Sequence, residues 1–326
     1  MKSLILASGA AFLLTLVSGR VAIPVLRKLK AGQPIYHYVK THSGKRGTPT
    51  MGGLFFVLPA TLVFFAFGGA KSKVATVGAA IGLFYMLIGF LDDFIKIKFR
   101  HNEGLKPYQK IIFQMLIALL AGAFIFVNSL TQVFIPFTEK SFDLGVWAMP
   151  VAAVTFIAMT NSVNLTDGLD GLCGGVSFVY TLFLGLILYL QSRFSSPYLK
   201  SAEYDGLILL LVSSLGAIVG FLVFNVPKAK VFMGDTGSLA LGGFLCAVTV
   251  FSGNLLFAPI IGIAFVWSSL SVIIQVAYFK RTKKRVFLMA PFHHHLQMKG
   301  FSETQIGFYY SLFTVIMGII SVIFYI

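Results

Sequence analysis

Long runs of apolar residues, separated by short polar connections, dominate the 326-residue chain. As helices, runs of about 17 to 25 apolar residues are long enough to cross the ~30 Å hydrocarbon core of a bilayer. The pattern therefore predicts an all-α integral membrane protein with ten transmembrane helices and a single domain over residues 1–326. The expected spans are 3–25, 52–70, 74–95, 109–128, 146–163, 173–191, 205–225, 237–253, 257–279 and 304–326.

The composition supports this class. Hydrophobic residues make up 57% of the chain and charged residues only 11%, whereas a soluble domain carries about 25% charged residues. Met1-Lys2 and the apolar residues after it imitate a signal peptide, but no small-residue cleavage site followed by a soluble domain appears, so we expect a retained first helix. Cys173 and Cys246 lie in or beside apolar segments and predict no disulfide framework.

The charge distribution predicts an orientation in the membrane. The net charge is +15, and 19 of the 26 Lys and Arg residues lie in alternate connections, at 27–46, 96–110, 228–230 and 280–299. Basic connections face the cytoplasm in membrane proteins, which places both termini outside. One outside connection, at 128–145, is expected to form a small hairpin on the membrane surface.

Two adjacent aspartates, Asp92 and Asp93, end the third apolar segment and are followed by Lys96. On a helix, either carboxylate can share a face with that ammonium group. The two carboxylates repel each other at a helix end that already carries partial negative charge, and a divalent cation would relieve both problems. These residues alone leave two interpretations open: a salt-bridged cap at the membrane interface, or a divalent cation site.

Three further aspartates, Asp167, Asp170 and Asp235, also lie at the cytoplasmic ends of apolar segments and not at their centres. A charge at the centre of a bilayer costs at least ~2.5–3.5 kcal/mol, a cost that ion and proton pathways accept. The position of these acids disfavours a transporter or channel. It favours an enzyme whose cytoplasm-facing cleft joins a soluble substrate to a lipid.

Two polar turns hold candidate ligand-binding groups, and each also has a plainer structural interpretation. Asn164 and Asp167, with the glycines after them, form either an Asx turn or a surface that reads a polar ligand. Asp235 is either the N-cap of the eighth helix or part of a phosphate site at that helix N-terminus. Phe232 either presents a flat face to a base or packs in the core.

Two other cytoplasmic connections carry groups that suit anions. Three consecutive side chains cannot share one helical face, so His293, His294 and His295 predict a loop, where donation to phosphate oxygens is preferred over zinc binding. Residues 45–53 place glycines and hydroxyl groups, including Thr50, before the second helix, where an anion would be stabilised. Gly52 and Gly53 equally suit close helix packing.

Five motifs follow one another along nearly the whole chain: GTPTMGG at 47–53, DDFIK at 92–96, NLTDGLDG at 164–171, FMGDTGS at 232–238 and PFHHH at 291–295. In this order and on the predicted cytoplasmic side, they resemble the polyprenyl-phosphate N-acetylhexosamine-1-phosphate transferase family. The first and last motifs favour its phospho-N-acetylmuramoyl-pentapeptide branch over the GlcNAc-1-phosphate branch. A GlcNAc-1-phosphate transferase is the nearer alternative, and a nucleotide or cation transporter is the distant one.

The resemblance implies a Mg2+-dependent enzyme of peptidoglycan synthesis in the bacterial cytoplasmic membrane. Such an enzyme transfers phospho-MurNAc-pentapeptide from UDP-MurNAc-pentapeptide to undecaprenyl phosphate, and it forms lipid I and UMP at a site that faces the cytoplasm. The family also implies a fragmented ninth helix and a homodimer, with no nucleic-acid partner.

The resemblance also assigns roles to residues. It implies that three carboxylates form the catalytic set and ligate the metal, with Asp92 as base or lipid-phosphate organiser: Asp92, Asp93 and Asp235. Basic side chains would contact phosphates: Lys96, Lys110, His293, His294 and His295. The remaining groups would line the nucleotide side, with Phe232 stacked on uracil: Lys45, Asn164, Asp167, Asp170, Asn225 and Phe232. Thr50 would also bind substrate, and Lys96 and His293 would count among the catalytic residues.

Overall fold

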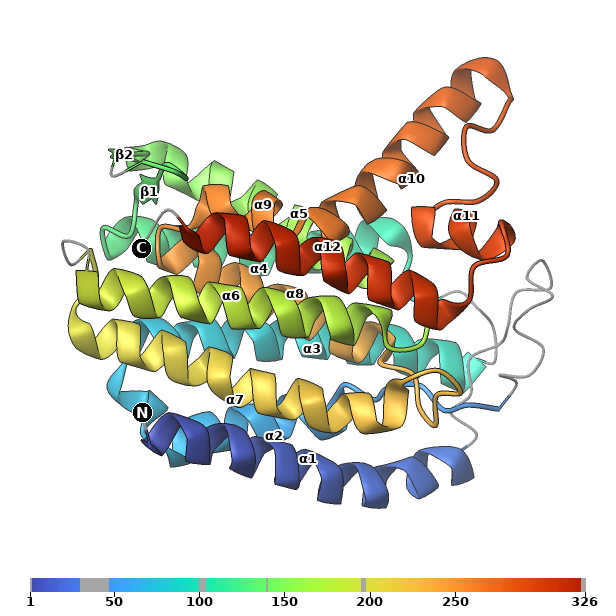
Figure 1. The fold of residues 1–326 in the computed structure, drawn as a ribbon, viewed down its shortest axis with the longest axis horizontal. Coiled ribbons are helices and arrows are strands. Elements are labelled where there is room, and N and C mark those ends of the chain that lie inside the picture. Colours follow the sequence, from blue (N-terminus) through green and yellow to red (C-terminus); the bar gives the residue numbers. More distant parts are fainter. Residues whose placement is uncertain (1, 30–46, 100–103, 139, 195–197, 324–326) are drawn as a thin grey trace.

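The computed structural model describes residues 2–29, 47–99, 104–138, 140–194 and 198–323. Long helices lie side by side in a bundle, with a two-stranded hairpin at one end (Figure 1). The helices are α1 (Lys2–Lys28), α2 (Leu54–Ala66), α3 (Lys73–Phe99), α4 (Pro107–Val127), α5 (Ala148–Thr166), α6 (Leu172–Phe194), α7 (Ser201–Asn225), α8 (Gly234–Phe251), α9 (Ala258–Ile261), α10 (Ile263–Thr282), α11 (Phe292–Met298) and α12 (Glu303–Ile323). The strands are β1 (Gln132–Phe134) and β2 (Ser141–Asp143), and 3-10 turns form η2 (Gly69–Lys71), η3 (Gly145–Trp147) and η4 (Leu255–Phe257).

Helix α8 occupies the middle of the bundle. Its residues are small or apolar on nearly every side of the helix, and 94% of them are buried, as expected for a helix surrounded by protein. Helix α3 is its most extensive partner. Glycines permit this close approach, since a Cβ at Gly82 would overlap the ring of Phe244 and one at Gly243 would overlap Tyr85.

Every predicted apolar segment contains helix, but the count of ten crossings is not reproduced. Among the described residues, nine helices are long and apolar enough to cross a membrane. The segment predicted over 52–70 forms only the 13 residues of α2, which span about 20 Å at 1.5 Å per residue. The segment predicted over 257–279 is divided into η4, α9 and α10, with a break at Gly262, and α10 then leans out of the bundle (Figure 1).

The two ends of the bundle carry different features. Helix α1 begins and α12 ends at the same end as β1 and β2, here called the hairpin end (Figure 1). Val133 pairs with Phe142 in this antiparallel hairpin, which confirms the hairpin predicted for residues 128–145. At the opposite end, here called the aspartate end, α3, α5 and α7 finish and α4, α6 and α8 begin.

Candidate active site

Asp93, on α3, caps the first turn of α8 from a neighbouring helix. Its carboxylate accepts hydrogen bonds from the backbone N–H groups of Asp235 (3.3 Å) and Thr236 (3.0 Å) and from the Thr236 hydroxyl (2.7 Å). The first N–H groups of a helix lack partners within it, and Met233 supplies no side-chain cap here. The interpretation of Asp235 as the N-cap is therefore wrong, because α8 begins at Gly234 and Asp235 lies inside its first turn.

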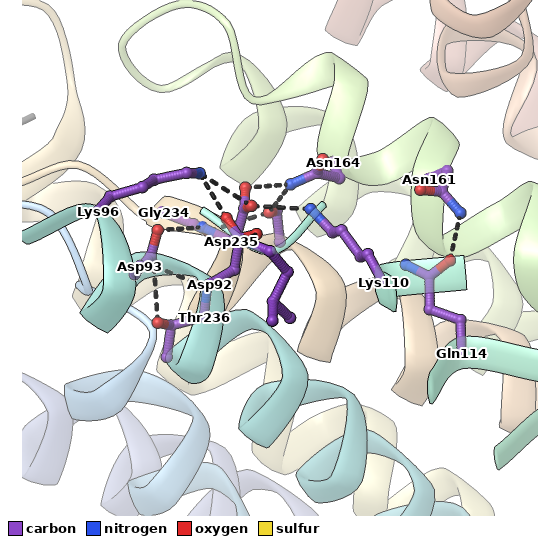
Figure 2. Close-up of polar contacts among 12 residues, drawn as sticks. Asp92, Asp93, Lys96, Lys110, Gln114, Asn161, Asn164, Gly234, Asp235 and Thr236 are labelled. Carbon is purple, nitrogen blue, oxygen red and sulfur yellow. Dashed lines mark hydrogen bonds and ion pairs between the residues drawn. The ribbon is translucent and has the colours of Figure 1, made fainter. Parts of the chain in front are cut away.

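Two lysines join the remaining aspartates into an ionic cluster beside this cap (Figure 2). Lys96 Nζ lies 2.6 Å from Asp92 Oδ2 and 3.1 Å from Asp235 Oδ2. Lys110 Nζ lies 2.8 Å from the same Asp235 oxygen, and Leu105 N–H donates to Asp92 Oδ1 over 2.9 Å. With Asp93, three carboxylates face two ammonium groups, which leaves a formal excess of negative charge. Because an uncompensated buried charge is costly, a cation would be stabilised here.

The second oxygen of Asp235 is held from α5. Asn164 Nδ2 donates to Asp235 Oδ1 over 2.7 Å and to Ser238 Oγ over 2.8 Å. Ser238 Oγ donates in turn to the carbonyl of Gly234 over 2.9 Å. The Asp235 carboxylate is thus fixed by lysines from α3 and α4 on one oxygen and by an amide from α5 on the other.

The carboxylate oxygens fit a hard divalent cation. One ligand oxygen from each of Asp92, Asp93 and Asp235 lies within 4.8 Å of the others. Mg2+ takes oxygen ligands and usually binds through one or two carboxylates together with substrate phosphates. Asp93 has the least capacity left, because α8 already engages its oxygens. The partners of Asp92 and Asp235 include lysines, which can turn to an anionic substrate when a cation takes their place.

The first motif runs beside the segment that precedes α8. Phe232 N–H donates to the carbonyl of Pro49 over 2.8 Å, and Gly52 N–H donates to the carbonyl of Phe232 over 2.9 Å. Thr50 is fully buried, whereas Phe232 is half-buried. Lys45, predicted to line the nucleotide side, lies outside the described residues.

Asp170 and Asn225 join the turn after α5 to the same segment. Asp170 Oδ2 accepts the N–H of Ala229 over 3.0 Å. Asn225 Oδ1 accepts the N–H of Gly171 over 3.1 Å, and Asn225 Nδ2 donates to the carbonyl of Val231 over 2.9 Å. Both side chains are buried, and backbone groups engage them. In this structure, Asp170 and Asn225 therefore hold the backbone around the site in place.

His293, on α11, packs against the turn after α5 that carries Asp167. A Cβ at Gly168 would overlap the His293 imidazole, so this ring lies directly against the turn. Burial, and then the charge of Asp235, raises the pKa of Asp167 well above its ordinary value. Burial, and then His294, lowers the pKa of His293 well below its ordinary value. Both shifts disfavour the charged form of the side chain.

The three histidines do not lie in a loop, so that prediction is wrong. They occupy the first turn of α11, after Pro291. Consecutive residues of a helix point in different directions, and only His293 is fully buried, while His294 and His295 are partly exposed. His295 Nδ1 accepts the N–H of Leu288 over 3.1 Å. The sequence argument correctly denied them a common face, but a helix does not require one.

Comparison with known proteins assigns the chain to a family. A family model described as glycosyl transferase family 4 matches residues 75–253, and a phospho-N-acetylmuramoyl-pentapeptide-transferase signature matches residues 45–57. A phospho-N-acetylmuramoyl-pentapeptide-transferase of Clostridioides difficile is 41% identical over 320 residues, which cover 96% of this chain and 95% of the relative. The same-named protein of Caldanaerobacter subterraneus is 39% identical over 321 residues, with 98% of each chain covered. The chain belongs to the phospho-N-acetylmuramoyl-pentapeptide-transferase family.

Membership in the phospho-N-acetylmuramoyl-pentapeptide-transferase family confirms the resemblance drawn from the five motifs and makes the chain a transferase. The structure adds residues that sequence reasoning missed. Thr236 and Ser238 lie inside the FMGDTGS motif, so their hydroxyl groups were a usable signal. Glu303 had no such signal, yet its carboxylate accepts the N–H of Asp170 over 3.2 Å and joins α12 to the turn after α5.

Proposed function

We propose that the chain transfers phospho-MurNAc-pentapeptide from UDP-MurNAc-pentapeptide to undecaprenyl phosphate, with lipid I and UMP as products. The observation that carries this proposal is the meeting of Asp92, Asp93 and Asp235 with Lys96 and Lys110 in a member of this transferase family. The cluster offers acidic ligands and ammonium groups at one place. Transfer between two anionic phosphate compounds needs both.

The cofactor in this proposal is Mg2+, held by Asp235 and Asp92. When bound, Mg2+ would neutralise charge on the diphosphate and polarise the phosphoryl group that is transferred. Asp93 would act mainly through the cap, by fixing the α8 backbone that carries Asp235. Asn164 would hold the Asp235 carboxylate in one orientation.

The two lysines would stabilise phosphate charge. A phosphate monoester carries about −1.5 to −2 charges at pH 7, so an undecaprenyl phosphate nucleophile is already an anion and needs little base catalysis. In this proposal, Asp92 organises the lipid phosphate through its ion pair with Lys96. Lys110 reaches the same region from α4 and would bind a diphosphate oxygen.

The nucleotide would lie on the side of the cluster formed by the turn after α5 and the segment before α8. Phe232, which is only half-buried, would stack on uracil. Asp167 in that turn, and the His293 ring packed against the turn, would form hydrogen bonds with the nucleotide. His294 and His295 would contact phosphates from α11, and Lys45 would bind the nucleotide.

We also propose a location and an orientation. The aspartate end would face the cytoplasm of a bacterial cell, because the basic connections of the sequence belong to that end. Residues 47–53 together with α2 would complete a tenth crossing, and the functional unit would be a homodimer. The whole chain would act as one domain.

The experiment is a substrate-pair assay in detergent. UMP release is measured with undecaprenyl phosphate and either UDP-MurNAc-pentapeptide or UDP-GlcNAc, each with and without Mg2+. Of the two nucleotide substrates, we expect turnover only with UDP-MurNAc-pentapeptide, and only when Mg2+ is present. Turnover restricted to UDP-GlcNAc, or unchanged turnover without any divalent cation, would overturn the proposal.

A further inference from the structure

A second polar contact lies deeper in the bundle than the ionic cluster. Gln114 follows Lys110 by four residues on α4, and Asn161 precedes Asn164 by three residues on α5. Residues three or four apart share a face of a helix. On α4, Lys110 contacts Asp235 and Gln114 lies one turn away; on α5, Asn164 contacts Asp235 and Asn161 lies one turn away. Gln114 and Asn161 contact each other (Figure 2).

The contact between the two amides is one-sided. Asn161 Nδ2 donates to Gln114 Oε1 over 2.7 Å and to the carbonyl of Ile157 over 2.8 Å. Gln114 is fully buried, and within the described part of the chain its Nε2 has no hydrogen-bond partner. Tyr85, on α3, donates its hydroxyl to the backbone carbonyl of Gln114 over 3.2 Å. Gln114 thus ties together α3, α4 and α5.

The hairpin end contains a matched pair with a different geometry. Gln191 Nε2 donates to Asn254 Oδ1 over 2.9 Å, and Asn254 Nδ2 donates to Gln191 Oε1 over 2.9 Å. In this reciprocal contact, each buried amide both donates to and accepts from the other, so the pair can join two segments without leaving either amide group unpaired. Such interhelical bonds contribute about 0.6 kcal/mol on average in membrane proteins.

The Gln114–Asn161 pair stabilises the bundle less, because a buried amide group without a partner costs about 1–3 kcal/mol. Its position explains why it is nevertheless present. Lys110 of α4 binds Asp235 Oδ2, and Asn164 of α5 binds Asp235 Oδ1. A rotation of α4 against α5 would pull the two oxygens of one carboxylate in different directions, and the Gln114–Asn161 contact opposes that rotation.

We propose that Gln114 and Asn161 are positioning residues of the transfer reaction: their contact keeps α4 and α5 in the register in which Lys110 and Asn164 together orient the Asp235 carboxylate. The proposal rests on the proposed function for its kinetic consequence. Its geometric consequence, the protection of Lys110 within the ionic cluster, does not depend on any activity.

The kinetic test compares Gln114→Leu with the matched control Gln191→Leu. A misplaced catalytic group costs up to about a hundredfold in rate, and we expect about a tenfold fall in kcat for Gln114→Leu, with KM for both substrates within about twofold of the parent. We expect the exchange variant Gln114→Asn/Asn161→Gln to recover most of kcat. Gln191→Leu, measured on folded protein, should leave both constants unchanged. An unchanged kcat for Gln114→Leu, or an equal fall for Gln191→Leu, overturns the proposal.

The second test is independent of turnover. The acylation rate of Lys110 by an amine-reactive ester is followed by mass spectrometry, with Lys140 at the hairpin end as internal reference. We expect Gln114→Leu to speed Lys110 labelling at least about threefold relative to Lys140, because a loosened ion pair exposes the amine, and Gln191→Leu to leave the ratio unchanged. An unchanged ratio in Gln114→Leu overturns the positioning role even if the parent enzyme transfers nothing, whereas an inactive parent overturns only the proposed function.

Discussion

The hairpin end and the aspartate end share one structural device, a helix start capped by a carboxylate of another helix. At the hairpin end, Glu203 of α7 accepts the hydroxyl of Ser72 and the N–H of Val74 (2.9 Å) and so caps α3. At the aspartate end, Asp93 of α3 caps α8 in the same way. Helix α3 is therefore held by a carboxylate at its start and supplies one near its finish.

The difference lies in what surrounds the cap. At the aspartate end, Asp92 and Asp235 bring two more carboxylates within reach of the capping one. Packing this charge into a bundle costs free energy, and the cap does not need it. The hairpin end thus shows that one carboxylate is enough to cap a helix. We attribute the two additional carboxylates at the aspartate end to function. Four predictions test this division, beginning with the largest expected effect.

Removal of the Asp235 charge should affect chemistry far more than folding. In Asp235→Asn, Lys96 and Lys110 lose their shared anionic partner, and the proposed cation site loses a ligand. We expect UMP release to fall about a thousandfold or more. The matched change at the hairpin end, Glu203→Gln, should keep turnover within about twofold. Comparable losses of UMP release in both variants would show that the two ends do not differ in function in this way.

The contact between α3 and α8 can be tested within one helix. A Cβ at Gly89 would overlap the backbone of Asp235, whereas at Gly78 the nearest atom is 3.6 Å away. Overpacking of a core costs about 1–3 kcal/mol, so Gly89→Ala should lower the melting temperature and reduce turnover at least tenfold. Gly78→Ala should be tolerated in both measurements. Equal behaviour of the two variants would refute the close approach.

The two caps should be equivalent in stability and different in function. Loss of an N-cap costs about 0.5–2 kcal/mol, so Asp93→Ala and Glu203→Ala should lower the denaturant midpoint in detergent by similar amounts. Only Asp93→Ala should also reduce kcat per folded molecule, because Asp93 fixes the backbone of Asp235. If Glu203→Ala reduces kcat equally, the caps have no separate roles.

The smallest effect concerns pH. The pKa of folded His293 lies well below that of an ordinary histidine, which is about 6.5 in an unfolded chain. Below about pH 6.5, the unfolded chain therefore binds a proton that the folded chain does not, so stability is complete above that pH and falls as the pH drops. The melting temperature should fall between pH 7.5 and 5.5 in the parent and fall less in His293→Phe. Identical slopes would exclude His293 as the source.

Patterns along the chain predicted much of this structure because they report local physics. Apolar segments give the helices, and the hairpin follows from a short polar connection between them. The meeting of Asp92, Asp93 and Asp235 followed from the shared position of the motifs at one end of their helices. What escaped prediction depends on partners distant in sequence. Nothing near Asp93 indicates that it caps α8, because the cap is completed by residues more than a hundred positions away.

Two differences between the predictions and the structure have the same origin. Local spacing alone predicts a loop for the histidine run, whereas the run lies in α11 with only His293 of the three side chains buried. The second apolar segment, predicted over 52–70, is shorter as a helix because residues 69–71 form η2 at one end, and Gly52 and Gly53 pair with the segment before α8 at the other. Gly52 N–H donates to the carbonyl of Phe232 there. Tertiary contacts decided both cases.

The central claim is that the surplus carboxylates at the aspartate end hold a divalent cation, and Mn2+ binding to the detergent-solubilised enzyme tests it most directly. Electron paramagnetic resonance is recorded without substrate on the parent, Asp92→Asn, Asp235→Asn and Glu203→Gln. The account predicts one saturable Mn2+ site in the parent and in Glu203→Gln, weakened at least tenfold in both aspartate variants. An unchanged site in Asp92→Asn and Asp235→Asn would contradict it.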